Sequence, residues 1–234
     1  MALMLRRSDC RWTLESPRRL VHALTLITVQ AFGFFVIGPA LLAPLLLGDA
    51  DPFEAGSGAL ALCSILAVLD FAGVIAFGLL RVGRIRLSSL GWKTPLTLRV
   101  VLLGVAGGAA SVALVFGIWL TMESGRTLGG FVHEIAGFSA SQRVLFMLIG
   151  VQAAFVEETL FRGYLQPALI ARWGPVGIAL TAAIFALYHL NFRPVSLCSK
   201  FLFGLVFGAL RGRDRSLFAP AIAHALLWNI VGTT

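Results

Sequence analysis

"SQRVLFMLIGVQAAFVEETLFRGYLQPALIARW" runs from Ser141 to Trp173 and decides how this chain must fold. Most of the stretch is apolar enough to lie in lipid, yet Glu157, Glu158 and Arg162 interrupt it. A charge at the centre of a bilayer costs about 2.5–3.5 kcal/mol on insertion scales, so such residues normally face the interior of a helix bundle. The three charges therefore form either a structural ion pair between helices or part of a functional site.

The composition of the whole chain is that of an integral membrane protein. Hydrophobic residues make up 58% of the sequence and charged residues only 13%, about half of the roughly 25% found in soluble domains. The formal net charge of +8 would indicate nucleic-acid binding in a soluble protein. Here the basic residues flank apolar stretches, which favours membrane anchoring and no nucleic-acid partner. Cys10, Cys63 and Cys198 form no CxxC pair, so we expect neither a disulfide framework nor a structural zinc site.

Apolar segments long enough to span a bilayer recur along the chain. They predict an all-α fold, a polytopic transmembrane helical bundle of about seven spans. The range is six to eight, because the fifth and sixth segments are short. The first segment is too long for a signal-peptide core, so we expect it to stay as an anchor. We expect a basic cytoplasmic tail at 1–19 and a single transmembrane domain at 20–234, with the motif-bearing core at 143–232. The segments are 20–47, 57–80, 97–121, 143–170, 175–190, 199–210 and 217–232.

The distribution of Lys and Arg orients these spans. If the N-terminus is cytoplasmic, fifteen basic residues fall on the cytoplasmic side and four on the other, which also holds the acidic Asp49, Asp51 and Glu54. The positive-inside rule therefore predicts a cytoplasmic N-terminus and, with seven spans, an external C-terminus. The fifteen are Arg6, Arg7, Arg11, Arg18, Arg19, Arg81, Arg84, Arg86, Lys93, Arg99, Arg162, Arg172, Arg211, Arg213 and Arg215. The four are Arg126, Arg143, Arg193 and Lys200.

An ion pair explains only part of the central charge cluster. Glu158 and Arg162 are spaced i, i+4 and can pair on one helical face. Glu157 is rotated by about 100° from Glu158, and Phe161 occupies its own i+4 position. A purely structural interpretation therefore leaves Glu157 unexplained.

Two further polar motifs lie in the last apolar segments, "FALYH" at 185–189 and "AHALLWN" at 223–229. Taken singly, a histidine in such a segment is more often structural than catalytic. At about 1.5 Å per helical residue, Glu157 and His189 lie at similar depths, and helix tilt can absorb the shallower positions of His224 and Asn229. A carboxylate and imidazoles from three helices can thus converge on one buried point. That arrangement fits hydrolysis of an amide by an activated water.

The three motifs together resemble those of the CPBP family, the CAAX proteases and bacteriocin-processing enzymes also called the Abi family. "EETLFR" matches the EExxxR motif, "FALYH" the FxxxH motif and "AHALLWN" the terminal histidine-plus-asparagine motif, and "LSSLGWK" at 87–93 is similar to a short amphipathic segment often found before the third span. The resemblance implies an α-helical intramembrane endopeptidase acting on a membrane-associated protein or peptide. It assigns water activation to Glu157 and His189, bracing of that motif to Glu158 and Arg162, and oxyanion support to His224 and Asn229.

One position departs from the family pattern. The asparagine usually follows the histidine by four residues, and here Trp228 holds that position. Asn229 lies five residues after His224 and is rotated from it by about 140° on a regular helix. Either a local wide turn brings Asn229 inward, or its role is lost or taken by another group.

The motifs leave alternatives for cofactor and function. Two histidines and a glutamate could supply three zinc ligands, but no HExxH is present. We expect a glutamate-activated water without a metal, with zinc as the alternative. A non-catalytic protein acting in bacteriocin immunity or as a scaffold is the competing function. A small transporter with a proton relay ranks last, because no internal repeat is visible. The compact build and Arg-rich tail are typical of a bacterial inner-membrane protein, with the lipid bilayer and the substrate as partners.

Overall fold

The structure of the protein, a computed structural model, describes residues 16–48, 57–122 and 127–231. Within these ranges the chain forms helices and no strand, so the predicted all-α class is confirmed. Several residues used in the charge analysis lie outside the described ranges. They are Arg6, Arg7, Arg11, Asp49, Asp51, Glu54 and Arg126, and Cys10 lies outside them too.

The seven predicted segments correspond to the helices of the described residues. Three of the predicted segments contain two or three joined helices, and the other four contain a single helix each. Stretches of π-helix are labelled η. In chain order the elements are α1 (Pro17–Phe32), η2 (Gly33–Ile37), α2 (Gly38–Leu46), α3 (Ser57–Asp70), η3 (Phe71–Val82), η4 (Ser88–Trp92), α4 (Leu98–Met122), α5 (Leu128–Ala136), α6 (Ala140–Glu158), η5 (Thr159–Leu165), α7 (Gln166–Trp173), α8 (Val176–Tyr188), α9 (Pro194–Asp214) and α10 (Phe218–Val231).

Five of the helical segments in the described residues are long and apolar enough to cross a membrane. Of the rest, α8 and α10 are shorter apolar helices. The expectation of a short sixth segment was wrong, because α9 has 21 residues and begins at Pro194 rather than near residue 199. Proline is favoured in the first turn of a helix, and Ser196 and Ser199, which interrupt the apolar run, are buried against the bundle.

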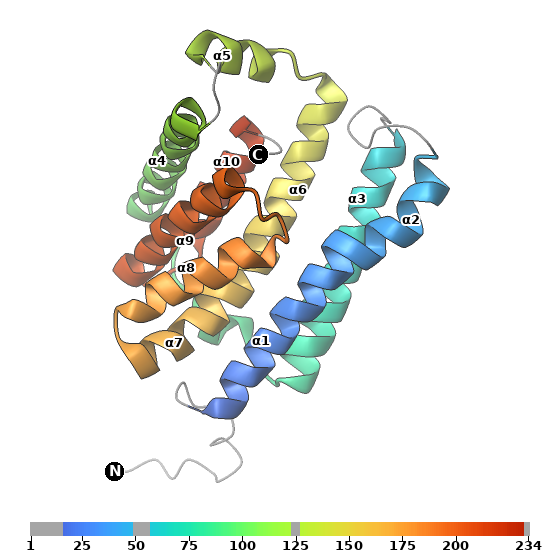
Figure 1. Cartoon of the computed structure of the whole chain (residues 1–234). Helices are drawn as coiled ribbons and strands as arrows, with labels where there is room; N and C mark the ends of the chain where they lie inside the picture. The colour runs from blue at the N-terminus through green and yellow to red at the C-terminus, as the bar shows by residue number, and fades with distance from the viewer. Residues whose placement is uncertain (1–15, 49–56, 123–126, 232–234) are drawn as a thin grey trace, which may run out of the picture.

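Two short elements add to the predicted spans. The helix α5 links the ends of α4 and α6 at the top of Figure 1. The segment η4 corresponds to the amphipathic stretch noted before the third span, and it is tied to the bundle. Arg211 Nη2 donates to Leu90 O at 2.8 Å, and Leu217 N donates to Gly91 O at 3.3 Å. The η4 segment therefore packs against the α9–α10 turn and is not a loose loop.

The long helix made by α6, η5 and α7 stands in the middle of the fold. In Figure 1, α1, α2 and α3 lie on one side of it, and α4, α8, α9 and α10 lie on the other. The helix α10 packs against both α4 and α6, α8 packs against α9, and α3 packs against α6. A capping box formed by Ser139 and Gln142 begins the central helix, satisfying backbone donors at its start. Residues of the central helix can thus meet groups from both halves of the bundle.

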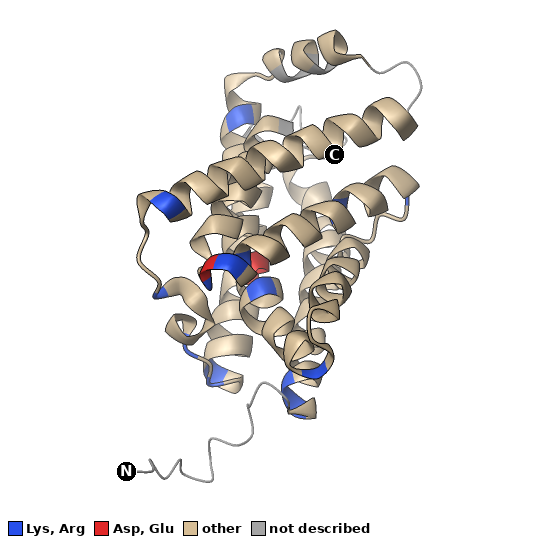
Figure 2. Ribbon diagram, turned by 90° about the vertical axis from the view of Figure 1, so that its left-hand side faces the viewer, with Lys and Arg blue, Asp and Glu red and all other residues tan. Residues whose placement is uncertain are grey.

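The charges follow the pattern of a membrane protein. Many of the Lys and Arg residues lie at the lower end of the bundle in Figure 2, whereas acidic residues lie in its middle. Arg81, Arg172 and Arg211 each occupy the last turn of a helix. With five apolar helices of membrane-crossing length among the described residues, the chain is an integral membrane protein with a polytopic helical bundle.

The contact between α8 and α9 depends on a glycine and gives a first prediction. A Cβ built on Gly204 would lie 2.7 Å from both Cα and Cβ of Ala182, whereas one built on Gly212 of the same helix meets nothing within 4 Å. We expect Gly204→Ala to lower the free energy of unfolding by about 1–3 kcal/mol through overpacking. Gly212→Ala should raise it by up to about 1 kcal/mol, because alanine favours the helix. Unfolding in detergent micelles, followed by tryptophan fluorescence, measures both; equal effects at the two glycines would contradict this packing.

Candidate active site

The two adjacent glutamates end α6 at the point where the helix widens into the π-helical η5. Thr159 Oγ1 donates to Phe155 O at 2.5 Å and accepts a hydrogen bond from Trp92 Nε1 at 2.9 Å. Further along η5, Arg211 Nε donates to Arg162 O at 3.3 Å. Side-chain hydrogen bonds to the backbone help to satisfy the groups of an irregular helix, and π-helical turns are frequent at functional sites. The widened stretch directly follows Glu157 and Glu158 and carries Arg162.

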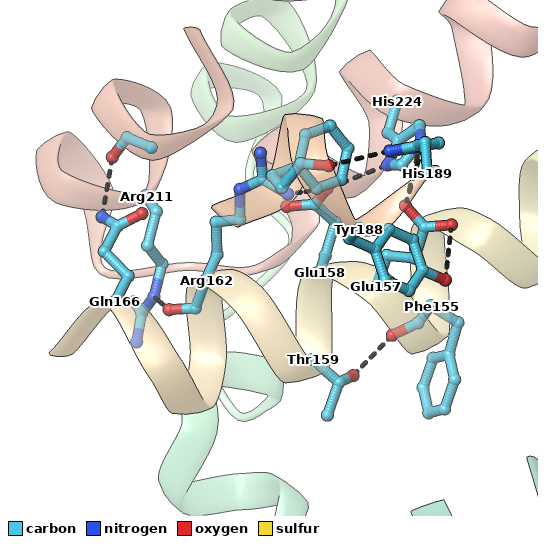
Figure 3. A network of polar contacts seen from close by, with 12 residues as sticks. Phe155, Glu157, Glu158, Thr159, Arg162, Gln166, Tyr188, His189, Arg211 and His224 are labelled. Atoms are coloured by element: carbon cyan, nitrogen blue, oxygen red, sulfur yellow. Dashed lines mark hydrogen bonds and ion pairs between the residues drawn. The ribbon is translucent and has the colours of Figure 1, made fainter. Parts of the chain in front are cut away.

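Glu158 lies at the centre of a buried charge network. Its Oε1 accepts hydrogen bonds from Arg162 Nη1 at 3.1 Å and from His224 Nδ1 at 2.9 Å (Figure 3). Glu158 and Arg162 are both 0% exposed, and the Arg162 guanidinium lies 4.2 Å from the centre of the Phe185 ring. The i, i+4 ion pair expected from the sequence is therefore present, and it also holds a histidine from α10.

Glu157 points toward both histidines of the later motifs. Its Oε2 lies 3.9 Å from His224 Nε2 and 4.0 Å from His189 Nε2, and its Oε1 accepts a hydrogen bond from Tyr188 at 3.5 Å. Figure 3 shows the three side chains meeting from the central helix, the end of α8 and α10. The expected convergence of a carboxylate and two imidazoles is thus present in the structure. Oε2 is buried and has no hydrogen-bond partner among the described residues.

The other nitrogen of each imidazole fixes the tautomer. His189 Nδ1 lies 2.8 Å from Phe185 O, and a carbonyl can only accept, so Nδ1 carries the proton. His224 Nδ1 faces Glu158, whose carboxylate is paired with Arg162, so the same assignment holds there. With its proton on Nδ1, a neutral imidazole presents the Nε2 lone pair toward Glu157. Two basic nitrogens and one carboxylate oxygen face a common point.

A cavity of about 30 Å³ borders this point. Its lining includes His189 and His224, together with Lys200 from α9 and Trp228 from α10. This volume is large enough for a water molecule. The histidine side chains are only 10% and 3% exposed, so the space is largely shielded from bulk solvent.

Asn229 does not join this group. The helix α10 is α-helical from Phe218 to Val231, so the wide turn considered from the sequence is not observed. The Asn229 side chain is exposed and its Nδ2 donates to Ala225 O at 2.7 Å, within its own helix. Trp228 borders the cavity in its place. The one-residue shift in the motif thus turns the amide away from the glutamates.

Three residues near the site were missed from the sequence. Tyr188 directly precedes the histidine of "FALYH" and contacts Glu157. Lys200 was assigned to the external side, although Pro194 signals a helix that includes it. Asp70 is a lone carboxylate in the second apolar segment, a signal in itself. It is 6% exposed and accepts hydrogen bonds from Gln30 at 2.9 Å and from Gln152.

The residues present give no metal centre. Within the described part of the chain, no group of three or more His, Cys, Asp or Glu side chains has the geometry to hold a metal ion. Glu157 Oε2 and the two Nε2 atoms are the nearest approach to a ligand set, at separations of 3.9 and 4.0 Å. These separations are slightly longer than those between the ligands of one tetrahedral zinc ion, so the three side chains would have to move closer together to hold a metal.

Comparison with known protein families finds one match, in the last part of the chain. Residues 139–231 match the family described as type II CAAX prenyl endopeptidase Rce1-like. The match begins at the cap of α6 and ends with α10, so it includes all three motifs and every residue that meets at Glu157. Searches of curated proteins and of solved structures find no match. The resemblance to CAAX proteases that the motifs indicated is thus confirmed over residues 139–231, where the chain is similar to this family.

Proposed function

We propose that this protein is an intramembrane endopeptidase that hydrolyses a peptide bond through a water activated by Glu157 and His189. The observation that supports it most is the position of Glu157 Oε2, which lies within 4.0 Å of an Nε2 atom from each of two histidines. That separation is too long for a direct hydrogen bond and suits one water that donates one hydrogen bond to Glu157 and the other to a histidine. The match of residues 139–231 to a family of CAAX endopeptidases supports the same reaction class.

The proposed reaction adds one water across an amide. The water oxygen bonds to the carbonyl carbon while its proton passes to Glu157, and the π electrons of the carbonyl move onto its oxygen. When the tetrahedral intermediate collapses, the C–N bond breaks and the proton held by Glu157 passes to the departing nitrogen. His189 Nε2 accepts a hydrogen bond from the water. This hydrogen bond orients the water so that a lone pair of its oxygen points at the carbonyl carbon. The products are a carboxylic acid and an amine.

The site also contains Glu158, Arg162 and His224, which position the groups around the water. Glu158 and Arg162 hold His224 through its Nδ1, so its Nε2 stays directed at Glu157. An imidazole fixed in this way can take part in binding the water, whereas donating to the oxyanion, as the resemblance implies for His224, would need a proton on Nε2 as well. Breaking a buried ion pair on one side is costly, about 3–5 kcal/mol. Arg162 and Glu158 are thus positioning residues whose loss also lowers stability.

Asn229 is expected to contribute little, although the resemblance assigns it oxyanion support. Its amide donates to Ala225 O and the side chain is exposed. We expect Asn229→Ala to keep peptide cleavage within about threefold of wild type, whereas losing an oxyanion donor costs about 10²–10³ in kcat. Cleavage rates of the two purified proteins in lipid vesicles test this. A hundredfold loss in Asn229→Ala would show that α10 adopts another register during the reaction.

Metal removal gives another prediction. Since Glu157 is the proposed base and no proposed step needs a metal, we expect 1,10-phenanthroline or EDTA to leave the cleavage rate of the purified protein unchanged. The control is a zinc endopeptidase treated in the same vesicles, which must lose activity. Inhibition that is reversed by added zinc would contradict the metal-free mechanism.

We further propose that the protein lies in a bacterial cytoplasmic membrane with its N-terminus inside, and that its substrate is a membrane-associated protein or peptide. The concentration of arginines at one end of the bundle supports this orientation. The family description names prenylated CAAX sequences as the substrates of its type II members. An internally quenched peptide ending in a farnesylated Cys-aliphatic-aliphatic-X sequence is therefore the first probe to use.

A comparison of strains tests the proposed function in the cell. Membrane proteins are compared by mass spectrometry among a deletion strain, the strain restored with wild type, and the strain restored with Glu157→Gln. The proposal expects proteins whose termini are processed with wild type and unprocessed in the other two. If Glu157→Gln restores the wild-type pattern, the protein acts by binding, as an immunity protein or scaffold does.

A further inference from the structure

We propose that Lys200 supplies the positive charge that stabilises the oxyanion during peptide hydrolysis, the role that the displaced Asn229 does not fill. The inference rests on the proposed function and adds a catalytic residue that lies outside the three motifs. Lys200 lies in the second turn of α9, and this helix contributes no other polar group to the lining of the small cavity.

The donors around the cavity point to this lysine. Amide hydrolysis needs hydrogen-bond donors where negative charge develops on the carbonyl oxygen. The two imidazoles use their Nδ1 protons on Phe185 O and on Glu158. Among the described residues of the lining, that leaves the Lys200 ammonium and the Trp228 indole as side-chain donors, and only Lys200 carries a full charge.

The position of Lys200 fits this role. Its Nζ donates to Ser196 Oγ at 3.1 Å, which fixes the direction of the ammonium. Lys200 lines the same small cavity as His189 and His224, so the charge lies beside the groups that would activate the water. Charge interactions of this kind are strong where bulk water is excluded. The ammonium would face the carbonyl oxygen while Glu157 and His189 act on the water.

The size of the cavity favours an oxyanion over a substrate carboxylate. About 30 Å³ accommodates a water and one approaching oxygen, and it is small for a terminal carboxylate with its attached chain. A lysine that binds such a carboxylate would act in the ground state and change KM. One that binds the oxyanion acts in the transition state and changes kcat.

The test uses the farnesylated quenched peptide and the purified protein in vesicles. Wild type and Glu157→Gln are measured first: if wild type does not cleave, the proposed function fails and this inference fails with it. If wild type cleaves, Lys200→Met should lower kcat by about 10²–10³ with KM within threefold, and Lys200→Arg should retain more activity because it keeps the charge.

Lys93→Met removes the chain's only other lysine, an exposed one, and should have no effect. Trp228→Phe, which removes the second donor, should lower kcat less than Lys200→Met does.

A binding measurement separates this role from a structural one. In a phosphinate analogue of the peptide, an anionic tetrahedral group replaces the scissile amide. Lys200→Met should weaken binding of the phosphinate about a hundredfold, while binding of the uncleaved peptide in a Glu157→Gln background stays unchanged. If Lys200→Met does not fold, Lys200→Gln replaces it, with the same expected loss of phosphinate binding and the same unchanged binding of the uncleaved peptide. A normal kcat, a rise in KM alone, or equal weakening of both ligands would each overturn the inference.

Discussion

Glu157→Gln is expected to reduce peptide cleavage by at least about 10³-fold while the protein remains folded in the membrane. Glutamine keeps the shape of the side chain and its contact with Tyr188, but it cannot accept the proton of a water near neutral pH. General base catalysis contributes about 10²–10⁴ to rates, and here the same group also returns the proton to the leaving nitrogen. The measurement is kcat for the quenched farnesylated peptide in vesicles, with product masses confirmed by mass spectrometry.

The matched control for this variant is Asp214→Asn. Asp214 ends α9 and pairs with Arg99 at 3.1 Å, so it offers a carboxylate outside the candidate site. This change should leave the cleavage rate of the folded protein within about twofold of wild type, because it removes no group of the candidate site. Retention of more than a tenth of wild-type kcat by a folded Glu157→Gln protein would contradict the role given to Glu157.

His189→Ala is expected to have the second-largest effect, a loss of about 10²–10⁴ in kcat. The imidazole is held by Phe185 O through Nδ1 and directs Nε2 at Glu157. Alanine removes this acceptor and opens space beside the cavity. Added imidazole should therefore restore part of the rate, an outcome that a mainly structural role would not give. The rate as a function of imidazole concentration measures this.

His133→Ala is the matched control for the histidine. His133 lies in α5 and is exposed, so its loss should not change the cleavage rate. Full activity of His189→Ala, or a loss that imidazole does not relieve despite normal folding, would remove His189 from the proposed mechanism.

The fold could be predicted from the sequence to a large extent, because lipid imposes a simple rule on the chain. Each span must be apolar and helical, so seven apolar segments predicted the helices and their order. The rule failed at α9, where Ser196 and Lys200 interrupt the apolar run yet face the protein interior. Hydropathy predicts which segments are apolar enough to lie in lipid. It cannot distinguish a polar residue that lines an internal cavity from one that lies outside the membrane.

The sequence motifs predicted which residues of the candidate site converge, but not how each side chain is oriented. Motif spacing and depth brought Glu157, Glu158, His189 and His224 together, and the structure places these side chains in contact or within 4.0 Å. Neither spacing nor depth gives rotation about the helix axis relative to a neighbour. The orientation of Asn229 therefore could not be predicted from the sequence. It follows from the regular α-helical geometry of α10 in the structure.

The most direct test of the account is whether Glu157 and His189 act on the same water. Single-turnover cleavage of the farnesylated peptide is measured for wild type, Glu157→Gln, His189→Ala and the double variant. Groups that act as one unit are strongly non-additive, so the double variant should cleave about as slowly as Glu157→Gln alone. If instead the two losses multiply, the carboxylate and the imidazole work independently, and a shared activated water is contradicted.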